Sequence, residues 1–193
     1  MYLLCEDGLN KSVQNMFDGT LESAVTCQKC NNVSLTKDRY MDLSLDISDL
    51  GVRSLESALS KFTELEHLSS DNLVECSRCH KRRMVSKKIS LVSTPSVLCL
   101  HLKRFDYDRY GRLRRLSKKV NFEDTLDLSP FMSDSPKKIV SGHQPNYNLY
   151  GLICHKGSSC TSGHYIAYVK RGSSWWLAND SSVRVISEST VLR

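Results

Sequence analysis

Two sets of residues in this sequence have types and spacings that suit chemistry, and the first is a pair of Cys-x-x-Cys motifs. Cys27 and Cys30 form one motif, Cys76 and Cys79 form the other, and 45 residues separate them. A Cys-x-x-Cys turn places two sulfurs on one side of a loop, and four such sulfurs match the tetrahedral coordination of a structural zinc. The two motifs therefore predict a Zn²⁺ site that joins two distant parts of the chain.

Two alternatives to zinc are four reduced cysteines without metal and a dithiol redox pair. A redox motif needs only one such pair, so the second pair argues against it. His80 directly follows Cys79 and is an alternative ligand, although a solvent-facing histidine is the simpler interpretation. Of the other cysteines, Cys99 and Cys154 lie in apolar segments and are expected to be buried packing residues.

The second set is a histidine with a polar partner. His164 is expected to open a strand, and fourteen residues separate it from Asn179. A turn at residues 172–174 would return the chain so that the Asn179 carboxamide accepts a hydrogen bond from the imidazole and fixes its tautomer, as in Cys-His-Asn sites. A histidine in a strand, taken alone, is more often a packing or surface residue, which is our interpretation of His101 and His155.

The elements that would position these residues are mostly strands. Leu55, Ala58, Leu59 and Phe62 recur at helical spacing, and Ser54 is a suitable N-cap for that helix. A second short helix is expected at residues 10–17. Alternation of apolar and polar residues predicts strands at 39–47, 84–91, 96–105, 147–155, 164–170, 175–178 and 183–186.

In the strand expected at 39–47, the alternation places Met41, Leu43, Leu45 and Ile47 on one face. Residues 133–146 are expected to form a loop, because they carry two prolines and a glycine. Since strands outnumber helices, the fold class predicted is α+β with antiparallel sheet.

Length and composition indicate one globular domain, or one domain with a subdomain. The chain has 193 residues, of which 40% are hydrophobic and 25% charged. It contains no apolar run long enough to cross a bilayer and no basic leader before its first apolar residues, so no membrane partner and no secretory signal are expected. An intracellular location in a reducing compartment follows, in which disulfides are not expected.

The formal net charge is +6, part of which lies in two basic clusters. Such clusters can meet phosphate or an acidic protein surface, but solvated hairpin loops are the interpretation favoured for them. The clusters are Lys81, Arg82, Arg83, Lys87 and Lys88, and Arg109, Arg112, Arg114, Arg115, Lys118 and Lys119.

Several motifs of this sequence resemble those of the ubiquitin-specific proteases, and they occur in the order expected for that family. The histidine signature of that family is matched by Tyr147, Leu149, Gly151, Leu152, His155, Gly157, Gly163, His164 and Tyr165. The segment Leu100–Phe105 resembles the family's central strand motif, and Asp42–Asp46 and the two Cys-x-x-Cys motifs are also similar to the family pattern. The resemblance covers almost the whole chain.

This resemblance implies a papain-like, hand-shaped fold with an antiparallel palm sheet and zinc-ribbon fingers. The whole chain, 1–193, would be one catalytic domain, with fingers at about 20–35 and 70–92 and palm at about 36–69 and 93–193. The implied activity is thiol-dependent hydrolysis of isopeptide bonds at the C-terminal glycine of ubiquitin, so ubiquitin and ubiquitinated proteins would be partners, with no direct nucleic-acid contact.

The same resemblance implies the roles of individual residues. His164 would be the general base, Asn179 the third member of the catalytic triad and Asp180, also catalytic, the acidic residue that often follows it in the family. Gly163 and Tyr165 would contact the ubiquitin tail. The cysteines Cys27, Cys30, Cys76 and Cys79 would hold the zinc.

The sequence departs from the family pattern in three places. Ala178 stands where the family usually has an aromatic residue, and Asn179 stands where many members have Asp. No segment resembles the family's Gly-Asn-Thr-Cys nucleophile motif, since Cys5 precedes Glu-Asp-Gly. The domain is therefore expected to be incomplete at its N-terminal side and inactive alone. The alternatives are a non-catalytic ubiquitin-binding fragment and a basic zinc-ribbon protein that binds nucleic acid, which leaves the histidine signature unexplained.

Within the family, Leu55–Cys79 and Leu126–Met132 resemble the deubiquitinase of the SAGA transcription coactivator. That similarity implies monoubiquitinated histone H2B as substrate and subunits of a SAGA-like complex as partners. It favours the nucleus over the cytoplasm.

Overall fold

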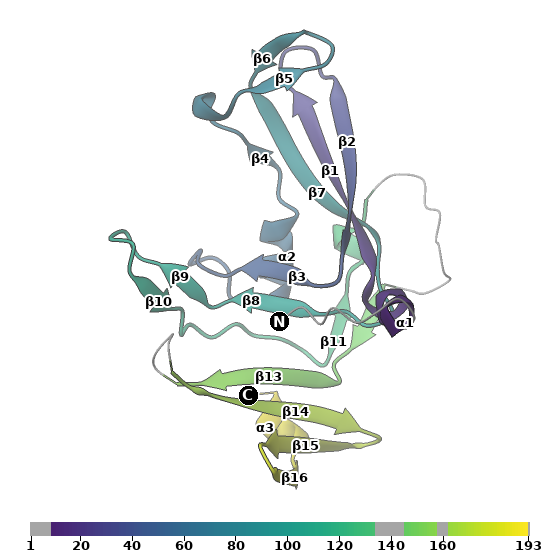
Figure 1. Ribbon diagram of the computed structural model, residues 1–193, viewed down its shortest axis with the longest axis vertical. Helices are drawn as coiled ribbons and strands as arrows, with labels where there is room; N and C mark the ends of the chain where they lie inside the picture. The colour runs from purple at the N-terminus through teal and green to yellow at the C-terminus, as the bar shows by residue number, and fades with distance from the viewer. Residues whose placement is uncertain (1–8, 134–144, 158–161, 193) are drawn as a thin grey trace. The chain divides into compact units, whose positions relative to one another are not determined.

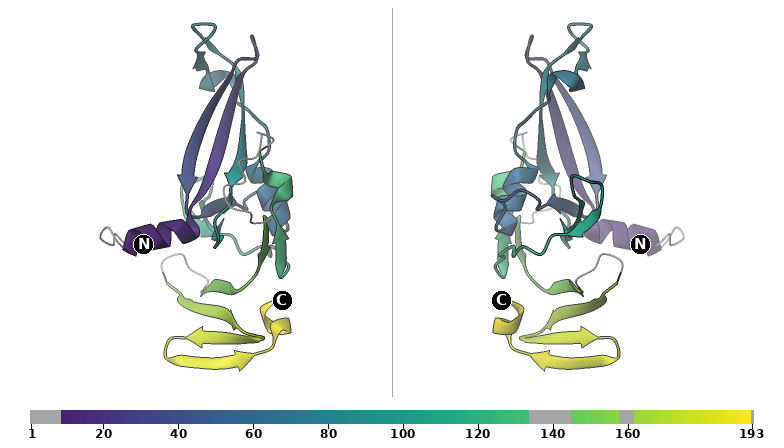
Figure 2. Two further views of the ribbon diagram at one scale, coloured as in Figure 1. Left: turned by 90° about the vertical axis from the view of Figure 1, so that its right-hand side faces the viewer. Right: turned by 90° about the vertical axis from the view of Figure 1, so that its left-hand side faces the viewer.

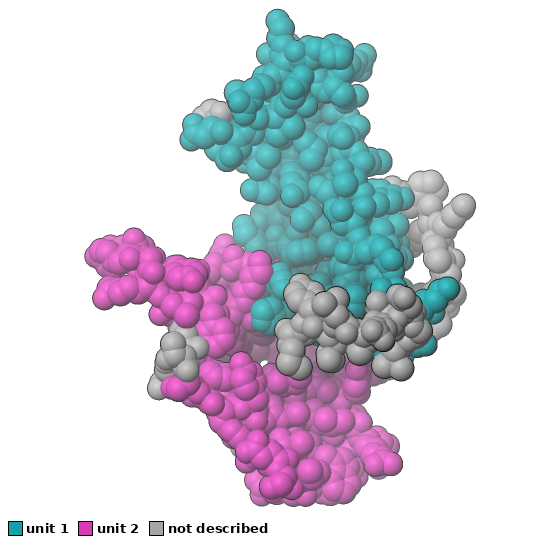
Figure 3. Space-filling model, viewed as in Figure 1, with its two compact units in different colours: residues 1–45, 59–101, 128–145 teal, residues 46–58, 102–127, 146–193 magenta. Residues whose placement is uncertain are grey.

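The computed structural model describes residues 9–133, 145–157 and 162–192, and its chain divides into two compact units. Unit 1 comprises residues 1–45, 59–101 and 128–145, and unit 2 comprises residues 46–58, 102–127 and 146–193 (Figure 3). Most of the loop expected at 133–146 lies outside the described residues, as do Cys5 and Cys160. None of the helices within the described ranges is long and apolar enough to cross a membrane.

Unit 1 is built on a four-stranded antiparallel sheet in the order β2-β1-β7-β4. The long strands β1, β2 and β7 run side by side in every view (Figures 1 and 2). The hairpin β5–β6 follows at one end of this sheet (Figure 1). The bounds are β1 Gly19–Cys27, β2 Val33–Tyr40, β4 Glu66–His67, β5 Val74–Cys76, β6 Lys81–Arg83 and β7 Val85–Ser93.

Short helices complete unit 1, and three elements contain a boundary between the units. The helices are α1 (Leu9–Phe17) and the 3-10 turns η1 (Ser70–Asn72) and η2 (Ser129–Phe131). The boundary elements are β3 (Leu43–Asp46), β8 (Leu100–Lys103) and α2 (Leu55–Phe62), and β3 pairs with β8.

Helix α2 forms as its sequence predicts. The Ser54 hydroxyl accepts a hydrogen bond from the backbone N–H of Ser57 at 3.2 Å, which satisfies a donor of the first turn and confirms the predicted N-cap. The apolar stripe is buried where it is most regular, with Ala58 and Leu59 no more than 1% exposed.

The single strand expected at 39–47 is wrong, because the chain bends at residues 41 and 42 and separates β2 from β3. Leu43, Leu45 and Ile47 are buried as the alternation predicts, whereas Met41 is 46% exposed. Alternation of residue types continues through a bend, so periodicity alone does not reveal it. The strands expected at 96–105 and 147–155 are interrupted in the same way, between β8 and β9 and between β12 and β13.

Unit 2 contains a second four-stranded antiparallel sheet, in the order β13-β14-β15-β16, with α3 against β15 (Figure 1). The side chains of Ile166, Trp175 and Val191 are at most 6% exposed and form its core. Two antiparallel strand pairs, β9–β10 and β11–β12, precede this sheet. The bounds are β9 Phe105–Tyr107, β10 Leu113–Arg115, β11 Thr125–Asp127, β12 Asn146–Asn148, β13 Gly151–Lys156, β14 His164–Arg171, β15 Ser174–Asn179, β16 Ser182–Ile186 and α3 Glu188–Val191.

The observed class is thus mixed helix and sheet with mostly antiparallel pairing, as predicted. Each unit has buried apolar residues of its own, such as Leu91 in unit 1 and Trp175 in unit 2. The proposed division into fingers and palm stays a prediction, although both predicted finger segments, 20–35 and 70–92, fall within unit 1.

Candidate functional site

The structure brings His164 and Asn179 together. His164 is the first residue of β14 and Asn179 the last of β15, and these strands pair antiparallel with Ala167 opposite Ala178. The turn after β14 contains Gly172, whose φ of +59° lies in the left-handed region that glycine adopts readily. The strand–turn–strand arrangement expected from the sequence therefore positions a hydrogen bond between the imidazole Nε2 of His164 and Oδ1 of Asn179.

This hydrogen bond assigns the histidine tautomer. A carboxamide oxygen only accepts, so Nε2 carries the proton in the neutral imidazole and Nδ1 keeps its lone pair. The side chain of His164 is 44% exposed. A histidine held at one nitrogen, with a lone pair on the other and solvent access, can act as a general base.

Asp180 adds a carboxylate to the same imidazole. Its Oδ2 lies 3.9 Å from Nε2 of His164, and its backbone adopts a positive φ of 50° at the start of the turn into β16. The side chain of Asp180 is 80% exposed, so solvent screens much of its attraction for a charged partner.

The two predicted substrate-binding residues flank His164, and both contact His155. The ring of His155 occupies the position where a Cβ on Gly163 would stand, so no other residue fits there without moving that ring. Tyr165 is 61% exposed, and its ring centroid lies 4.8 Å from that of His155. The Nδ1 of His155 is buried and has no hydrogen-bond partner among the described residues.

Among the described cysteines, none forms a hydrogen bond with His164. Cys99 is exposed and Cys154 is half-buried, so the prediction that both are buried packing residues is wrong for Cys99, which lies just before β8. Desolvation raises the pKa of both thiols. A raised pKa disfavours the thiolate, so neither residue has the character of an activated nucleophile.

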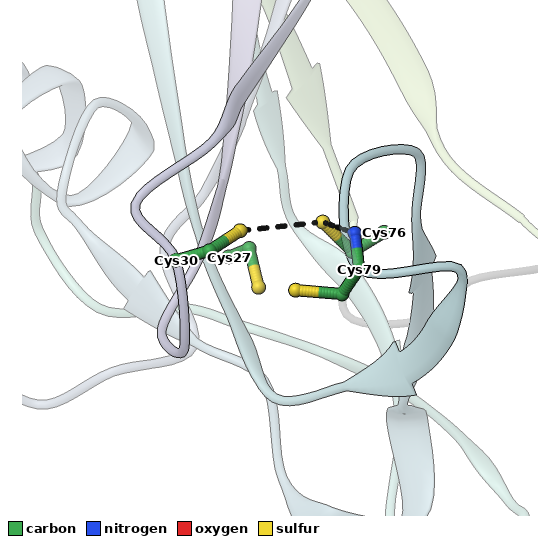
Figure 4. A group of neighbouring side chains, drawn as sticks. All are labelled: Cys27, Cys30, Cys76 and Cys79. Carbon is green, nitrogen blue, oxygen red and sulfur yellow. Dashed lines mark hydrogen bonds between the residues drawn. The ribbon is translucent and has the colours of Figure 1, made fainter.

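The four cysteines of the Cys-x-x-Cys motifs converge in unit 1 (Figure 4). Their sulfurs all lie within 4.8 Å of one another. Each motif forms the same turn, in which the residue after the second cysteine bonds back to the carbonyl of the first: Asn31 N to Cys27 O at 2.9 Å and His80 N to Cys76 O at 2.8 Å. Both turn residues, Asn31 and His80, have positive φ angles of 55° and 52°.

The donor set fits a tetrahedral metal. Four sulfurs bonded to zinc at about 2.3 Å would be separated by about 3.8 Å, and the sulfurs of Cys30 and Cys76 are 3.7 Å apart. The backbone N–H of Cys79 points at the Cys76 sulfur at 3.4 Å and lowers the pKa of that thiol to about 7. Four cysteines this close together could bind a metal ion.

Most of the second basic cluster lies exposed on or near the β9–β10 hairpin, as expected, but several of its arginines also have partners within unit 2. Arg112 pairs with Asp108 at 3.3 Å and Arg114 with Asp106 at 2.9 Å. Arg115 bonds to backbone carbonyls of the segment that precedes His164, a contact that the sequence analysis missed. The one sequence feature that could have indicated a crowded site here is the pair of glycines at 157 and 163, where the two backbone segments approach closely.

Comparison with known proteins identifies similar chains. The profile of the family described as "Ubiquitin carboxyl-terminal hydrolase" matches residues 6–193. Arabidopsis thaliana "Ubiquitin carboxyl-terminal hydrolase 23" is 38% identical over 183 residues, which are 93% of this chain and 20% of that protein. Xenopus laevis "Ubiquitin carboxyl-terminal hydrolase 22-A" is 32% identical over 207 aligned residues, which are 90% of this chain and 39% of that protein.

Solved structures give the same result. The structure titled "Structure of the SAGA Ubp8/Sgf11/Sus1/Sgf73 DUB module bound to ubiquitin aldehyde" matches with a TM-score of 0.80 and 34% identity, over 98% of this chain and 41% of that chain. A SAGA DUB module of the same four subunits bound to monoubiquitin matches with a TM-score of 0.81 and 36% identity, over 93% of this chain and 39% of that chain. The chain thus spans between about a fifth and two fifths of the length of these four relatives.

Proposed function

The chain belongs to the ubiquitin carboxyl-terminal hydrolase family, and from this premise we propose that it acts in thiol-dependent hydrolysis of the isopeptide bond at the C-terminal glycine of ubiquitin. His164 serves as the general base and Asn179 as the residue that orients it. The observation that carries this proposal is the hydrogen bond between Nε2 of His164 and Oδ1 of Asn179. It leaves Nδ1 as the basic nitrogen.

Each proton in this reaction passes through His164. Nδ1 takes the proton of a cysteine thiol, and the resulting thiolate attacks the carbonyl carbon of the ubiquitin terminal glycine. The imidazolium then donates that proton to the departing lysine amine, which leaves a thioester. Water attacks the thioester while Nδ1 accepts a proton from it, and the thiol is regenerated.

Asn179 and Asp180 both lie beside the base. The neutral carboxamide of Asn179 fixes its tautomer without adding charge. The carboxylate of Asp180 lies 3.9 Å from Nε2 and is largely exposed. Replacement of Asn179 with Leu removes the acceptor, so we expect both tautomers of His164 to become populated in the ring ¹⁵N spectrum. Asn179→Asp retains an acceptor and is the control.

The thiol of this reaction is not assigned to any described cysteine. Four of the described cysteines gather in the cluster of unit 1, and the pKa of the other two thiols is raised. We therefore expect the 193-residue chain alone to bind ubiquitin without hydrolysing a ubiquitin–fluorophore conjugate. Clear turnover that is lost in Cys5→Ala would overturn this expectation.

Calorimetry tests the binding half of the proposal. Ubiquitin with its complete tail is titrated into the chain, and ubiquitin lacking the last two glycines is the matched control. Gly163 has no side chain beside His164 and Tyr165 is exposed next to it, so these two residues are proposed to receive the tail. Equal affinity for the two ubiquitins would contradict this role, and no affinity for either would contradict the proposed function as a whole.

The metal of the cysteine cluster is proposed to be zinc, held by Cys27, Cys30, Cys76 and Cys79. A structural zinc would supply coordination energy that links the turn after β1 to the β5–β6 hairpin, and it takes no part in the reaction. The 3.7 Å separation of the Cys30 and Cys76 sulfurs supports this assignment. Elemental analysis should find one zinc per chain. A dialysed protein that contains no zinc and is as stable as before would contradict the zinc assignment.

The subgroup suggests where this activity occurs. The similarity to chains whose titles name a SAGA DUB module with Sgf11, Sus1 and Sgf73 supports subunits of a SAGA-like complex as partners of this chain. Monoubiquitinated histone H2B as substrate and the nucleus as location follow from that assignment. Affinity purification from nuclear extract, with Leu126→Asp as a comparison variant, tests whether such subunits associate.

A further inference from the structure

The β9–β10 hairpin is tied to the backbone that leads into His164 through one arginine. Arg115 ends β10, where it pairs with Phe105 of β9. Its guanidinium reaches across to β13: Nη2 donates to the carbonyl of His155 at 3.0 Å, and Nη1 donates to the carbonyl of Gly157. A planar guanidinium with two parallel donors suits two carbonyl oxygens from one short segment.

The segment that Arg115 holds also packs tightly against the start of the next strand, at Gly163. A Cβ on Gly157 would lie 2.9 Å from the Cα of Gly163, so the two glycines stand against each other at the end of the β13–β14 ladder. The His155 ring fills the space beside Gly163. We call the residues Gly157 and Gly163, with His155, the neck.

The hairpin contacts the neck a second time through an aromatic ring. The centroid of Phe105 lies 5.7 Å from that of His155, edge to face, and His155 in turn lies 4.8 Å from Tyr165. Since Phe105 and Arg115 face each other across the hairpin, both ties come from the same pair of residues. The hairpin is itself held by the Arg114–Asp106 ion pair.

The neck lies next to the proposed base in the chain. The last pair of the β13–β14 ladder is Lys156 with His164, and Lys156 lies between the two residues whose carbonyls Arg115 holds. Asn179 fixes one ring nitrogen of His164, but the direction of the ring also depends on where its own backbone lies. A shift of the neck would misalign the imidazole with its acceptor.

We propose that Arg115 is a positioning residue: by holding the carbonyls of His155 and Gly157 it keeps His164 aligned with Asn179, and it makes the β9–β10 hairpin part of the hydrolytic machinery. This inference rests on the proposed role of His164 as the base. Any partner that moves the hairpin would therefore change the alignment of the base through Arg115 and Phe105.

The test uses Arg115→Met in the zinc-loaded 193-residue chain. Two properties are measured: the tautomer of neutral His164 by ring ¹⁵N NMR, and hydrogen exchange of the amides at 155–157 and 162–165. The matched control is Arg114→Met, which removes the adjacent arginine and its ion pair with Asp106 but no contact with the neck.

We expect Arg115→Met to mix the two tautomers of His164 and to speed exchange of the neck amides by about tenfold, because two charge-assisted hydrogen bonds are lost. Arg114→Met should change exchange there less than about twofold. Arg115→Lys keeps the charge but not the planar fork, and should fall between Arg115→Met and the native chain.

The inference is overturned if Arg115→Met and Arg115→Lys both leave the tautomer and the exchange rates as in the native chain, or if Arg114→Met has an equal effect. Both measurements are made without ubiquitin or a thiol. A failure of ubiquitin binding would therefore contradict the proposed function and leave the positioning role intact, whereas an unchanged tautomer would contradict only the positioning role.

Discussion

The cysteine cluster of unit 1 and the His164 site of unit 2 are built by opposite means. In the cluster, all four donors come from the chain, two of them (Cys27 and Cys76) at most 6% exposed, and two turns of the same construction close around the centre. At His164, one ring nitrogen is bonded and the other is not engaged by any described cysteine, and the side chain is 44% exposed. A closed set of donors serves stability, whereas an open position serves chemistry.

The two regions are also stabilised differently. The turn after β1 and the β5–β6 hairpin meet at the four sulfurs, while the sheet that carries His164 is stabilised by an apolar core around Trp175 and Ile166. Loss of the proposed zinc should therefore damage the cluster of unit 1 and spare the His164 sheet, and loss of the core residue Trp175 should do the reverse.

The largest effect is expected for Cys76→Ser. Removal of one buried ligand should abolish stoichiometric zinc binding, since the binding free energy of a structural zinc, about 10 kcal/mol or more in small peptides, contributes directly to folding. Metal content and hydrogen exchange of β5–β7 measure the loss. Cys99→Ser is the control, because Cys99 is exposed and lies outside the cluster. Fast hydrogen exchange throughout β13–β16 in Cys76→Ser would contradict the conclusion that the two regions are stabilised separately.

Trp175→Ala is the reciprocal change. Trp175 is 2% exposed, its Nε1 donates to Glu188 at 3.2 Å, and the Lys170 ammonium lies 5.6 Å from its ring. Its removal should lower the free energy of unfolding by about 3–5 kcal/mol, measured by chemical denaturation.

Trp176→Ala, at the adjacent half-buried position, is the control for Trp175→Ala and should cost much less. Zinc content should be unchanged in both variants. A loss of zinc in Trp175→Ala would show that the cysteine cluster and the apolar core around Trp175 do not stabilise the two regions independently.

The two turns of the cluster allow a finer test. His80 and Asn31 both adopt positive φ, a conformation that costs most residues about 1–2 kcal/mol but that asparagine tolerates better. Glycine relieves the strain of the positive φ but gives the unfolded chain more conformational entropy, which offsets part of the gain. His80→Gly should therefore raise the free energy of unfolding by about 0.5 kcal/mol. Asn31→Gly should change it less, and both should keep their zinc. Destabilisation by His80→Gly would indicate that the His80 side chain has a role of its own.

The smallest effect concerns the ion pair beneath the His164 sheet. Hydrogen bonds from Lys170 and Trp175 and the charge of Lys170 lower the pKa of Glu188. A lowered folded-state pKa contributes stability above the unfolded value of about 4.3, which is lost as the pH falls through the folded value. Glu188→Gln should therefore be slightly less stable than the native chain at pH 7, and the difference should shrink as the pH falls below the unfolded value. A difference that does not shrink on acidification would point to packing and not to charge.

Much of the local structure was predictable, because it depends on neighbours in the chain. Ser54 caps α2 as its type and position predict, and the spacing of His164 and Asn179 around a turn at Gly172 produces their contact. The errors occur where the chain bends without a change in pattern, at Met41, and where an apolar context does not bring burial, at Cys99.

The sequence by itself determined which residues could do chemistry. The two cysteine motifs followed from type and spacing, and His164 with Asn179 followed from spacing together with the resemblance to the ubiquitin-specific proteases. Only the tertiary structure decided that Arg115, interpreted from sequence as part of a solvated basic loop, bonds to carbonyls 40 and 42 residues away. The physical reason is that spacing encodes contacts made along a strand or turn. A long side chain that crosses from one hairpin to another leaves no periodic trace.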